Sequence, residues 1–550
     1  MKRFLISLAV GLSTLVACSE KIDYQPPVSD GVVPSPNATI YGVVKCGDQP
    51  LKGVAVSDGV NVVLTNSNGV YNLNSKKKNA LVFISVPSGY EVPTSTSGAA
   101  QFYKGLKNRA SEPERVDFAL IKQNQDSYKM IVMGDIHLYT NSTARLFRES
   151  FIPEINKYAT ESPVPVYGMT LGDMSWDWYW YHDDNFGIEQ YLDAMKGLKG
   201  LPVYNTVGNH DHDMKFNSKV EFLSTGEDWT CMKKYRSLQG PTCFSYNIGG
   251  VHYVSLDNVI TIDTGGTTDK DSRGYWRGIT ETDMNWLKKD LSFVDRETPI
   301  VVSMHIPLFN WKSQVNAGND ESVNSTIEEI TAPFSPFEKV IFITAHTHQC
   351  YNTVDYDIDD FSVTEWNNGA VCGNFWGSTF NGLNLCTEGT PGGYRILSVD
   401  NGKITSSVYK GTTKKNGYVF RTYDRNKMNL SNESIAGYTT GGVLGEDNNN
   451  WVYIRIWDYK PTWKIVVKEG KKELQCMKFE SYDPLYLLML TTTNTKTAPS
   501  RTANMFKVQA SSATSELTIS ITDDYGNVYT ETMKRPKDFT LDTYIAEYTE

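Results

Sequence analysis

The chain has 550 residues, of which 40% are hydrophobic and 21% are charged. This composition predicts a protein with buried cores, and at roughly 100–200 residues per domain the length suits about three or four folding units. Disordered, collagenous and multi-spanning membrane classes are excluded. The formal net charge of −10 disfavours a nucleic-acid partner, because nucleic-acid backbones are negative too.

The first residues are predicted to direct export. Met1-Lys2-Arg3 is basic, and the apolar run from Phe4 to Val16 is shorter than the ~20 residues that span a bilayer. We interpret residues 1–17 as a signal peptide. The run ends in Leu15-Val16-Ala17-Cys18, which resembles the bacterial lipobox, in which the cysteine carries the lipid. The alternative is an ordinary signal peptide with an accidental cysteine.

Residues 18–37 are predicted to form a lipidated tether, because they are polar and rich in proline. The mature protein would then be an exported bacterial lipoprotein, anchored on the outer membrane through acylated Cys18 and facing the periplasm or the cell surface. Seven further cysteines follow, so structural disulfides or buried thiols are expected. Two pairs lie close enough in sequence to bridge short loops, namely Cys231 with Cys243 and Cys372 with Cys386.

Residues 38–123 are predicted to fold as an all-β domain. Short apolar alternations such as Ile40-Tyr41-Gly42-Val43-Val44 are interrupted by Gly, Pro, Asn and Asp at intervals that suit a β-sandwich. The pattern Pro50-Leu51-x-Gly53-Val54, followed by Asn68-Gly69-x-Tyr71, resembles the transthyretin-like type of small sandwich. This region contains no catalytic constellation, so we expect it to act as a spacer or a docking surface.

Residues 124–412 are predicted to form an α/β domain, since apolar strands alternate with amphipathic helix candidates. In Met284–Leu291, for example, leucines four apart share one helical face. From residue 413 to 550 β patterns return, as in Trp451–Trp457. We expect a C-terminal β-rich domain there.

Five apolar strands of the α/β region run directly into polar turns that contain carboxylate, imidazole or amide groups. Open α/β sheets bind ligands at the carboxyl ends of their strands, so these turns are predicted to meet in one crevice. The turns are Gly134-Asp135-Ile136-His137, Gly172-Asp173, Gly208-Asn209-His210-Asp211, His305 and Ala345-His346-Thr347-His348.

A pair of metal ions would explain this convergence. Oxygen and nitrogen donors without a thiolate suit Zn, Mn or Fe. The carboxylates of Asp135 and Asp173 would leave two divalent ions with an excess of positive charge, and the neutral amide of Asn209 preserves that excess. The excess would attract and polarise a phosphate.

The order D-x-H, G-D, G-N-H-D, a lone H and H-x-H resembles the calcineurin-like metallophosphoesterases, in particular a three-domain bacterial subgroup with N-terminal and C-terminal β domains. The resemblance implies a central α/β/β/α sandwich that holds two divalent ions. Carried over by position, one ion would be bound by Asp135, His137, Asp173 and His348, and the other by Asp173, Asn209, His305 and His346. His210 would be the unligated imidazole that protonates the leaving group.

The same resemblance implies a phosphoester substrate and hydrolysis by metal-bound hydroxide. We favour a phosphodiester or a pyrophosphate, because aromatic loops near the motifs suit groups on both sides of the phosphorus and no basic cluster suits a dianionic monoester. The alternative is a phosphomonoesterase acting on a nucleotide or sugar phosphate. An alternative of another class is a non-catalytic surface lipoprotein that binds a glycan or a partner. That alternative predicts a decayed ligand set, whereas all seven ligands are present, and no protein partner is evident.

Two residues depart from the family pattern. Ala345 stands where the family usually has glycine, which restricts the backbone but removes no ligand. Trp176 stands where purple-acid-phosphatase-like members carry a tyrosine ligand. A tyrosinate-bound ferric site is therefore not expected, and the identity of the metals stays open.

Five residues near the motifs are candidate substrate contacts, namely Trp176, His212, Trp276, Arg277 and Trp376. The aromatic run that begins at Trp176 follows Asp173 closely, and it either walls the crevice or packs against a neighbouring domain. Arg277 either binds a second phosphate or pairs with an acid. For His212 the alternative is a plain packing role.

Overall fold

The computed structural model describes residues 31–181, 185–213, 228–263, 273–313, 315, 323–358, 361–376, 380, 382–439, 449–495 and 497–549. From Pro34 onward the chain belongs to one compact unit. The predicted signal peptide, Cys18 and most of the tether lie outside the described residues. Within those residues, no helix is both long and apolar enough to cross a membrane.

The N-terminal region consists of short strands. They are β1 (Ile40–Cys46), β2 (Gln49–Pro50), β3 (Ala55–Ser57), β4 (Val62–Leu64), β5 (Val70–Leu73), β6 (Leu81–Ile84), β7 (Tyr90–Glu91), β8 (Tyr103–Gly105), β9 (Glu114–Arg115), β10 (Phe118–Ala119) and β11 (Ile121–Lys122). Strand β1 is the centre of one sheet, and β4-β3-β6-β8 form a second. Along β1, buried residues alternate with half-buried ones, as expected for a strand with one face in a core. The region is therefore β-rich as predicted, and its transthyretin-like character stays a prediction.

Two sheets form the central region. The first has the order β14 (Val203–Thr206), β13 (Val166–Leu171), β12 (Ser127–Met133), β25 (Gly393–Asp400) and β26 (Lys403–Gly411). The second has the order β15 (Phe244–Ile248), β16 (Val251–Ser255), β20 (Ile300–Ser303), β22 (Val340–Thr344), β24 (Phe361–Asn367) and β23 (Tyr351–Ile358). Both sheets are mixed. In the first, β12, β13 and β14 are parallel, and β25 pairs antiparallel with both β12 and β26. In the second, β16, β20, β22 and β24 are parallel, and the edge strands β15 and β23 pair antiparallel.

Helices and short elements complete the central region. The helices are α1 (Asn141–Glu161), α2 (Ile188–Met195), α3 (Asp228–Cys231), α4 (Lys233–Gln239), α5 (Glu281–Leu291) and α6 (Ile327–Thr331). The 3₁₀ turns are η1 (Asp177–Tyr181), η2 (Asn209–Asp211) and η3 (Ala332–Phe334). The short strands are β17 (Val259–Asp263), β18 (Arg273–Arg277), β19 (Ile279–Thr280) and β21 (Val323–Asn324).

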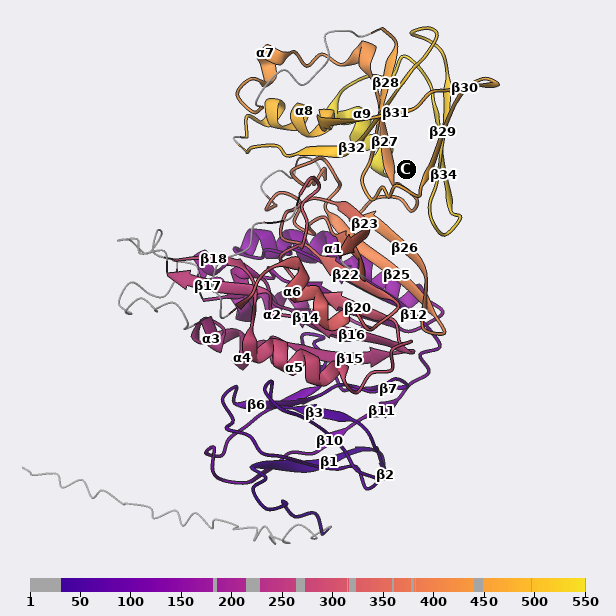
Figure 1. Cartoon of the computed structure of the whole chain (residues 1–550). Coiled ribbons are helices and arrows are strands. Elements are labelled where there is room, and N and C mark those ends of the chain that lie inside the picture. The colour runs from indigo at the N-terminus through magenta and orange to yellow at the C-terminus, as the bar shows by residue number, and fades with distance from the viewer. Residues whose placement is uncertain are drawn as a thin grey trace, which may run out of the picture. The chain divides into compact units, whose positions relative to one another are not determined.

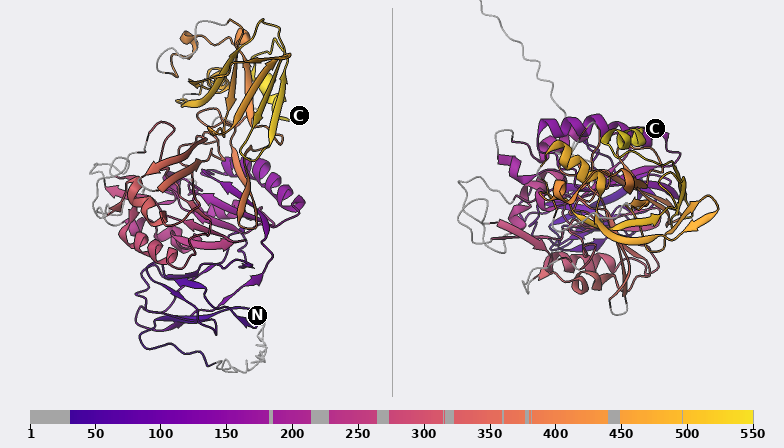
Figure 2. Two further views of the ribbon diagram at one scale, coloured as in Figure 1. Left: turned by 45° about the vertical axis from the view of Figure 1, so that its right-hand side comes forward. Right: turned by 90° about the horizontal axis from the view of Figure 1, so that it is seen from above.

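The two sheets pack face to face with helices outside them. In β12, Met130 and Val132 belong to the core shared with the second sheet, whereas Ile131 and Met133 belong to the core under α1 and α2. This alternation is the two-residue period of a strand buried on both faces. Helix α5 packs on the second sheet through residues such as Leu287. Helices α1 and α5 thus lie on opposite outer sides, an α/β/β/α arrangement (Figures 1 and 2).

The C-terminal region contains two further sheets. One has the order β27 (Phe420–Asp424), β28 (Trp451–Ile456), β32 (Arg501–Gln509) and β31 (Met477–Tyr482), and the other β30 (Lys472–Leu474), β29 (Lys464–Glu469), β33 (Leu517–Thr522) and β34 (Val528–Met533). The remaining elements are η4 (Arg425–Lys427), α7 (Asn432–Ile435), α8 (Pro484–Thr493) and α9 (Leu541–Thr549). One apolar core joins the facing sheets, and a second lies under α8 and α9. The predicted β-rich domain is therefore present.

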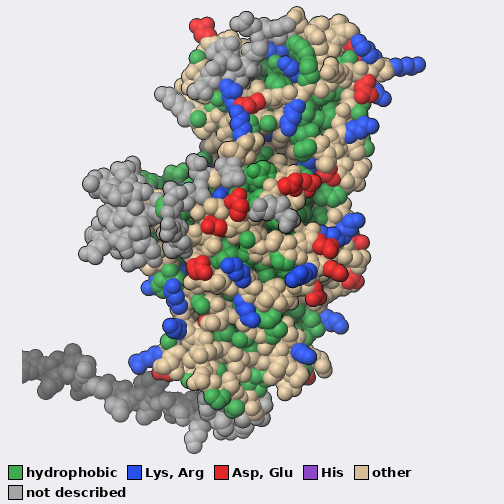
Figure 3. Space-filling view, in the orientation of Figure 1, with side chains coloured by type: hydrophobic (Ala, Val, Ile, Leu, Met, Phe, Trp, Pro, Cys, Tyr) green, Lys and Arg blue, Asp and Glu red, His purple; other side chains and the backbone are tan. Residues whose placement is uncertain are grey.

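The cysteines and the surface charges bear on two further expectations. All seven described cysteines are free, and five of them are buried, so of the two expected states the thiol form is the one adopted. On the face shown in Figure 3, basic and acidic side chains are intermixed and form no broad basic surface.

Candidate active site

The five predicted turns meet at the carboxyl ends of parallel strands from both sheets. Strands β12, β13 and β14 lead into Asp135 and His137, Asp173, and Asn209, while β20 and β22 lead into His305 and the pair His346 and His348. Six of these seven residues are buried, and His346 is half-buried. The sheet-to-sheet packing therefore places polar groups from two layers in one crevice.

One group of donor atoms surrounds the Nε2 atom of His137. That atom lies 3.1 Å from His348 Nε2, 3.5 Å from Asp173 Oδ2 and 3.9 Å from Asp135 Oδ1. His348 Nε2 lies 3.6 Å from the same Asp135 oxygen. Neighbouring donors about 2.0–2.2 Å from one ion are about 2.8–3.6 Å apart in tetrahedral or octahedral coordination. Three of the four separations fall in this range, and the 3.9 Å separation lies slightly above it. The spacing therefore fits a shared cation.

A second group surrounds the Nε2 atom of His305. That atom lies 2.9 Å from Asn209 Oδ1, 3.1 Å from Asp173 Oδ2 and 3.1 Å from His346 Nδ1. Asp173 Oδ2 thus faces both groups of donors. The other oxygen of Asp173 accepts the backbone N–H of His210 at 2.7 Å, which fixes the orientation of the carboxylate.

Backbone carbonyls fix the tautomers of two of the histidines. Nδ1 of His305 lies 2.7 Å from the carbonyl oxygen of Leu171, and Nδ1 of His348 lies 2.8 Å from that of Gly373. A carbonyl only accepts, so both Nδ1 atoms carry hydrogen, and in the neutral form of each ring Nε2 presents a lone pair. These lone pairs face carboxylate, amide and imidazole acceptors. Acceptors this close together require a positive charge between them.

The electrostatics of the acids support the same conclusion. Burial raises the pKa of Asp135 to about 8 against the opposing charge of His305, so its ionised form needs a compensating cation. Its Oδ2 accepts the N–H of His346, whereas the buried Oδ1 has no hydrogen-bond partner. Burial would also raise the pKa of Asp173, but the charges of His305 and His210 hold it well below its usual range.

The pKa values of the histidines differ according to their neighbours. Burial lowers the pKa of His346 to about 3 and that of His348 to about 4, so both are the neutral imidazoles that bind metals. For His305, burial is outweighed by Asp173 and Asp135, which raise its pKa to about 9. The negative charge that favours protonation of His305 would equally favour a metal cation beside its Nε2 atom.

The ligand turns have unusual backbone conformations. Asp135, His137, Asp173, His346 and His348 all have positive φ, between 44° and 67°. Residues other than glycine seldom adopt this region, at a cost of about 1–3 kcal/mol each, and such strain is concentrated at functional sites. These residues follow three strands, β12, β13 and β22, whose ends turn sharply enough to present the side chains at the crevice.

The methyl group of Ala345 fits because the neighbouring Gly134 has no side chain. A Cβ atom on Gly134 would lie 2.7 Å from the Cβ of Ala345, which is fully buried. The methyl group therefore occupies the space that Gly134 leaves open, and the departure from the usual glycine moves no ligand.

The sequence comparisons agree with this geometry. Residues 128–350 match the family model described as Calcineurin-like phosphoesterase. Residues 38–123 match the N terminal of Calcineurin-like phosphoesterase, and residues 365–529 match the C terminal of Calcineurin-like phosphoesterase. The chain is a calcineurin-like phosphoesterase. It is accordingly a metal-dependent phosphoric ester hydrolase.

Among solved structures, the phosphoesterase is similar to the phosphopantetheinyl hydrolase PptH from Mycobacterium tuberculosis, with 10% identity over 45% of this chain and 91% of that chain and a TM-score of 0.22. A cold-active protein-tyrosine phosphatase of a psychrophile, Shewanella sp., has 12% identity over 60% of this chain and 95% of that chain, with a TM-score of 0.21. No curated protein matches.

His210 of the phosphoesterase is partly accessible and has an acidic partner. Its side chain is 23% exposed, and Nδ1 lies 2.7 Å from Oδ1 of the buried Asp177. Burial would lower the pKa of His210, but Asp173 and Asp177 together raise it above its usual value. Asp211 accepts the N–H groups of Gly208, Met174 and Ser175, which ties the turns together.

Three of the predicted substrate contacts are corrected by their placement. Arg277 is buried, and its guanidinium donates to the carbonyl oxygens of Ser325, Pro307 and Leu308. His212 is fully buried with Nδ1 at 2.9 Å from the carbonyl oxygen of Gly208. Trp376 is buried and its indole N–H donates to the carbonyl oxygen of Ile136. These side chains are buried, and their polar groups are engaged by backbone carbonyls within the protein.

The remaining aromatic residues form a wall beside the ligands. The rings of Trp176 and Phe375 lie 4.8 Å apart at 31°, and Phe375 lies 4.4 Å from His348. Trp176 is also 5.2 Å from His210. Trp276 is half-buried, but its neighbour Tyr275 is the residue whose ring lies 5.7 Å from His346. Phe375 and Tyr275 are the chain neighbours of Trp376 and Trp276, the residues predicted as contacts, and it is these neighbours whose rings lie beside the histidines.

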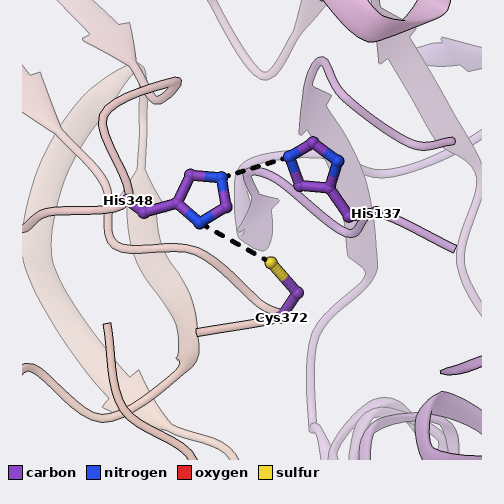
Figure 4. Close-up of side chains that lie close together, drawn as sticks. All are labelled: His137, His348 and Cys372. Carbon is purple, nitrogen blue, oxygen red and sulfur yellow. Dashed lines mark hydrogen bonds between the residues drawn. The ribbon is translucent and has the colours of Figure 1, made fainter. Parts of the chain in front are cut away.

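A thiol lies close to the first group of ligands. Cys372 Sγ is 3.8 Å from His348 Nδ1, and Figure 4 draws it with His348 and His137. That nitrogen is already held by Gly373, and burial raises the pKa of the Cys372 thiol well above its usual value. The neutral thiol donates to the carbonyl oxygen of Gly373 at 3.4 Å. Cys372 therefore lies at the Nδ1 side of His348, and its sulfur, a ring nitrogen of His348 and a ring nitrogen of His137 all lie within 4.8 Å of one another.

Proposed function

We propose that this phosphoesterase hydrolyses a phosphodiester or a pyrophosphate with two divalent ions. One ion would be held by Asp135, His137, Asp173 and His348, and the other by Asp173, Asn209, His305 and His346. The observation that carries the proposal is the position of Asp173 Oδ2, 3.5 Å from His137 Nε2 and 3.1 Å from His305 Nε2. One carboxylate oxygen is thereby available to both ligand groups.

The two ions would supply Lewis-acid polarisation of the phosphoryl group and activation of a water molecule at neutral pH. The protein holds the donors in place before substrate arrives. Asp173 and Asp135 each have one oxygen fixed by a backbone N–H, from His210 and His346 respectively. His305 and His348 are fixed by carbonyl groups. Such prior orientation lowers the cost of reaching the transition state.

His210 is the proposed general acid. Asp177 accepts from its Nδ1, so Nε2 is free to donate a proton to the departing oxygen. His210→Ala should retain both ions and reduce turnover of an ester with a poor leaving group by roughly 10²–10⁴-fold. An ester of p-nitrophenol, which leaves without a proton, should be hydrolysed nearly as before. Full activity on both substrates would contradict the assignment.

The composition of the walls supports a diester over a monoester. Trp176 and Phe375 lie beside the His210 end of the crevice, and Tyr275 lies beside His346. Apolar rings on both sides suit a phosphorus with two substituents. Arg277, the guanidinium that the sequence offered for a second phosphate, is used by backbone carbonyls. A phosphomonoesterase acting on a nucleotide or sugar phosphate is the second candidate.

Metal analysis and paired assays test the proposal. The purified chain without residues 1–18 would be stripped with chelator, reloaded with Mn²⁺ or Zn²⁺, and assayed on bis-p-nitrophenyl phosphate and p-nitrophenyl phosphate. We expect two ions per chain and faster hydrolysis of the diester. Faster hydrolysis of the monoester would favour the second candidate. Absence of turnover with either metal would favour a non-catalytic glycan- or partner-binding protein, against which the intact ligand set already argues.

We further propose that the phosphoesterase is an exported lipoprotein of the outer membrane, acylated at Cys18. The basic start, the apolar run and the lipobox-like residues support this. Labelling cells with a palmitate analogue should mark the wild-type chain and not Cys18→Ser. Equal labelling of both would contradict the proposal.

A further inference from the structure

The backbone of one proposed ligand, His348, is held by a segment distant in sequence. Its carbonyl oxygen accepts from both the N–H and the hydroxyl of Thr387, each at 3.3 Å. His348 has a φ of 51°, a conformation that persists only where the surroundings enforce it. Whatever fixes Thr387 therefore helps to fix the imidazole.

The segment around Thr387 is fixed in turn by Glu388. One carboxylate oxygen of Glu388 accepts the N–H of Cys350 at 2.6 Å, two residues beyond His348. The carboxylate also accepts the N–H and the hydroxyl of Thr390, both at 2.6 Å. Glu388 thus links the turn that carries His348 to residues 387–390.

The C-terminal domain holds this segment from the other side. Arg455, in β28, lies 3.3 Å from Glu388 in an ion pair whose side chains are 0% and 1% exposed, and it donates to the hydroxyl of Thr390 at 3.0 Å. Ser500 N–H donates to the carbonyl oxygen of Thr387 at 2.9 Å. Arg421 donates to the carbonyl oxygen of Gly389 at 3.3 Å. Three residues of the C-terminal domain therefore bind the segment from Thr387 to Thr390.

A second contact of the C-terminal domain is made to the segment that holds the His348 imidazole. The carbonyl oxygen that holds His348 Nδ1 belongs to Gly373, and the next residue, Asn374, donates to the hydroxyl of Tyr486 in α8 at 2.9 Å. The following residue is Phe375, whose ring lies 4.4 Å from the imidazole. The backbone and the ring of His348 are thus both positioned through groups of the C-terminal domain.

A buried ion pair is poor evidence for stability alone, because desolvation offsets much of the attraction. In some proteins a buried ion pair instead selects one arrangement of the chain. Here that arrangement would be the strained backbone conformation of the turn that carries His348. The family match to the C-terminal part also begins at residue 365, so the Thr387–Thr390 segment belongs to that part of the family pattern.

We infer that the C-terminal domain is a structural part of the metal centre, in which Arg455 and Glu388 act as positioning residues for His348. This inference rests on the proposed ligand set. It predicts an asymmetric dependence, because His348 belongs to one proposed ion and the ligands of the other come from β13, β14, β20 and His346. Removing the Glu388 charge should weaken one ion and leave the other.

The test uses the full mature chain and a matched control. Glu388→Gln breaks the pair with Arg455, while Asp424→Asn breaks another fully buried pair of the C-terminal domain, with Arg535 at 3.1 Å, that does not touch residues 387–390. Chelator competition with Zn²⁺ measures the affinity of each ion, and circular dichroism measures the melting temperature. We expect Glu388→Gln to weaken one ion about 10–100-fold, as is typical for groups that orient a metal ligand. Asp424→Asn should lower the melting temperature without changing either affinity.

Other outcomes separate the two proposals. A wild-type chain that binds fewer than two ions contradicts the proposed function. A wild-type chain with two ions, together with unchanged binding by Glu388→Gln or equal weakening by Asp424→Asn, overturns the role of the C-terminal domain. If Glu388→Gln does not fold, Thr387→Val removes only the hydroxyl bond to His348 and should weaken the same ion by a smaller factor. Unchanged affinity in Thr387→Val would then overturn the inference.

Discussion

Nδ1 of His210 lies 2.7 Å from Oδ1 of Asp177, and the two residues come from different 3₁₀ turns, η2 and η1. The carboxylate is buried, whereas the imidazole is partly exposed to the crevice. The pair therefore connects a fixed negative charge to a group that can exchange protons with substrate. Its consequence is measurable as a pH dependence.

Asp177→Asn should shift the alkaline limb of the activity profile to lower pH. Burial opposes protonation of His210, but Asp173 and Asp177 raise its pKa above the usual value, so the imidazolium persists to higher pH in the wild type. Loss of one negative charge lowers that pKa, and the acid form disappears sooner as the pH rises. The measurement is kcat against pH for a diester with a poor leaving group. A limb that stays in place would argue against His210 as the acid.

Phe375→Ala should change substrate preference more than chemistry. The ring lies over His348 and against Trp176, on the side of the crevice where His210 is found. Loss of a stacking surface costs about 0.5–1.5 kcal/mol beyond area burial, or roughly a three- to tenfold rise in KM. We expect this rise for diesters with aryl substituents and little change for dimethyl-type diesters. An equal loss on both kinds of substrate would indicate damage to the His348 turn.

The meeting of the predicted ligands in one crevice was predictable from sequence because each of them follows the end of a strand within a few residues. The strand-end rule needs no knowledge of distant contacts, and it brought Asp135, Asp173, Asn209 and His305 together correctly. Their assignment to particular ions stays a proposal. The layered core was likewise predictable, since strands buried on both faces read as continuous apolar runs.

The residues that support the ligands were not predictable. Asp177 is four residues beyond Asp173, and only the 3₁₀ turn η1 directs it to His210. Arg277 follows two aromatic residues, yet its own buried position at the end of β18 directs its guanidinium to carbonyl groups. Glu388 and Arg455 are 67 residues apart in numbering, and their contact exists only after the C-terminal domain has packed. Such pairings depend on tertiary structure, about which local patterns carry no information.

Gly208→Ala should reduce metal binding because the added methyl group would clash with Asp173. A Cβ atom there would lie 2.3 Å from the backbone nitrogen of Asp173 and 2.4 Å from its Oδ1, too close for any side chain. Overpacking of this kind costs about 1–3 kcal/mol and would displace the carboxylate that faces both ligand groups. Gly105→Ala is the control, because nothing lies within 4 Å of a Cβ at that exposed strand position. We expect a lower melting temperature and fewer bound ions for Gly208→Ala only. A fully loaded Gly208→Ala chain would show that the two turns can separate without loss of the centre.

Asp173→Ala and Asn209→Ala together test whether the two proposed ions share a ligand. Asp173 Oδ2 faces the Nε2 atoms of both His137 and His305. Asn209 Oδ1 lies 2.9 Å from Nε2 of His305, in the second group of donors. Removal of the carboxylate also removes a negative charge from a buried set of imidazoles, so both ions should bind much more weakly. Removal of the amide leaves the charge unchanged and deletes one donor of one ion. Metal content after gel filtration should therefore fall toward zero in Asp173→Ala and toward one ion per chain in Asn209→Ala. Equal residual content in the two variants would refute the shared carboxylate, because a ligand that serves only one ion cannot lower the occupancy of both.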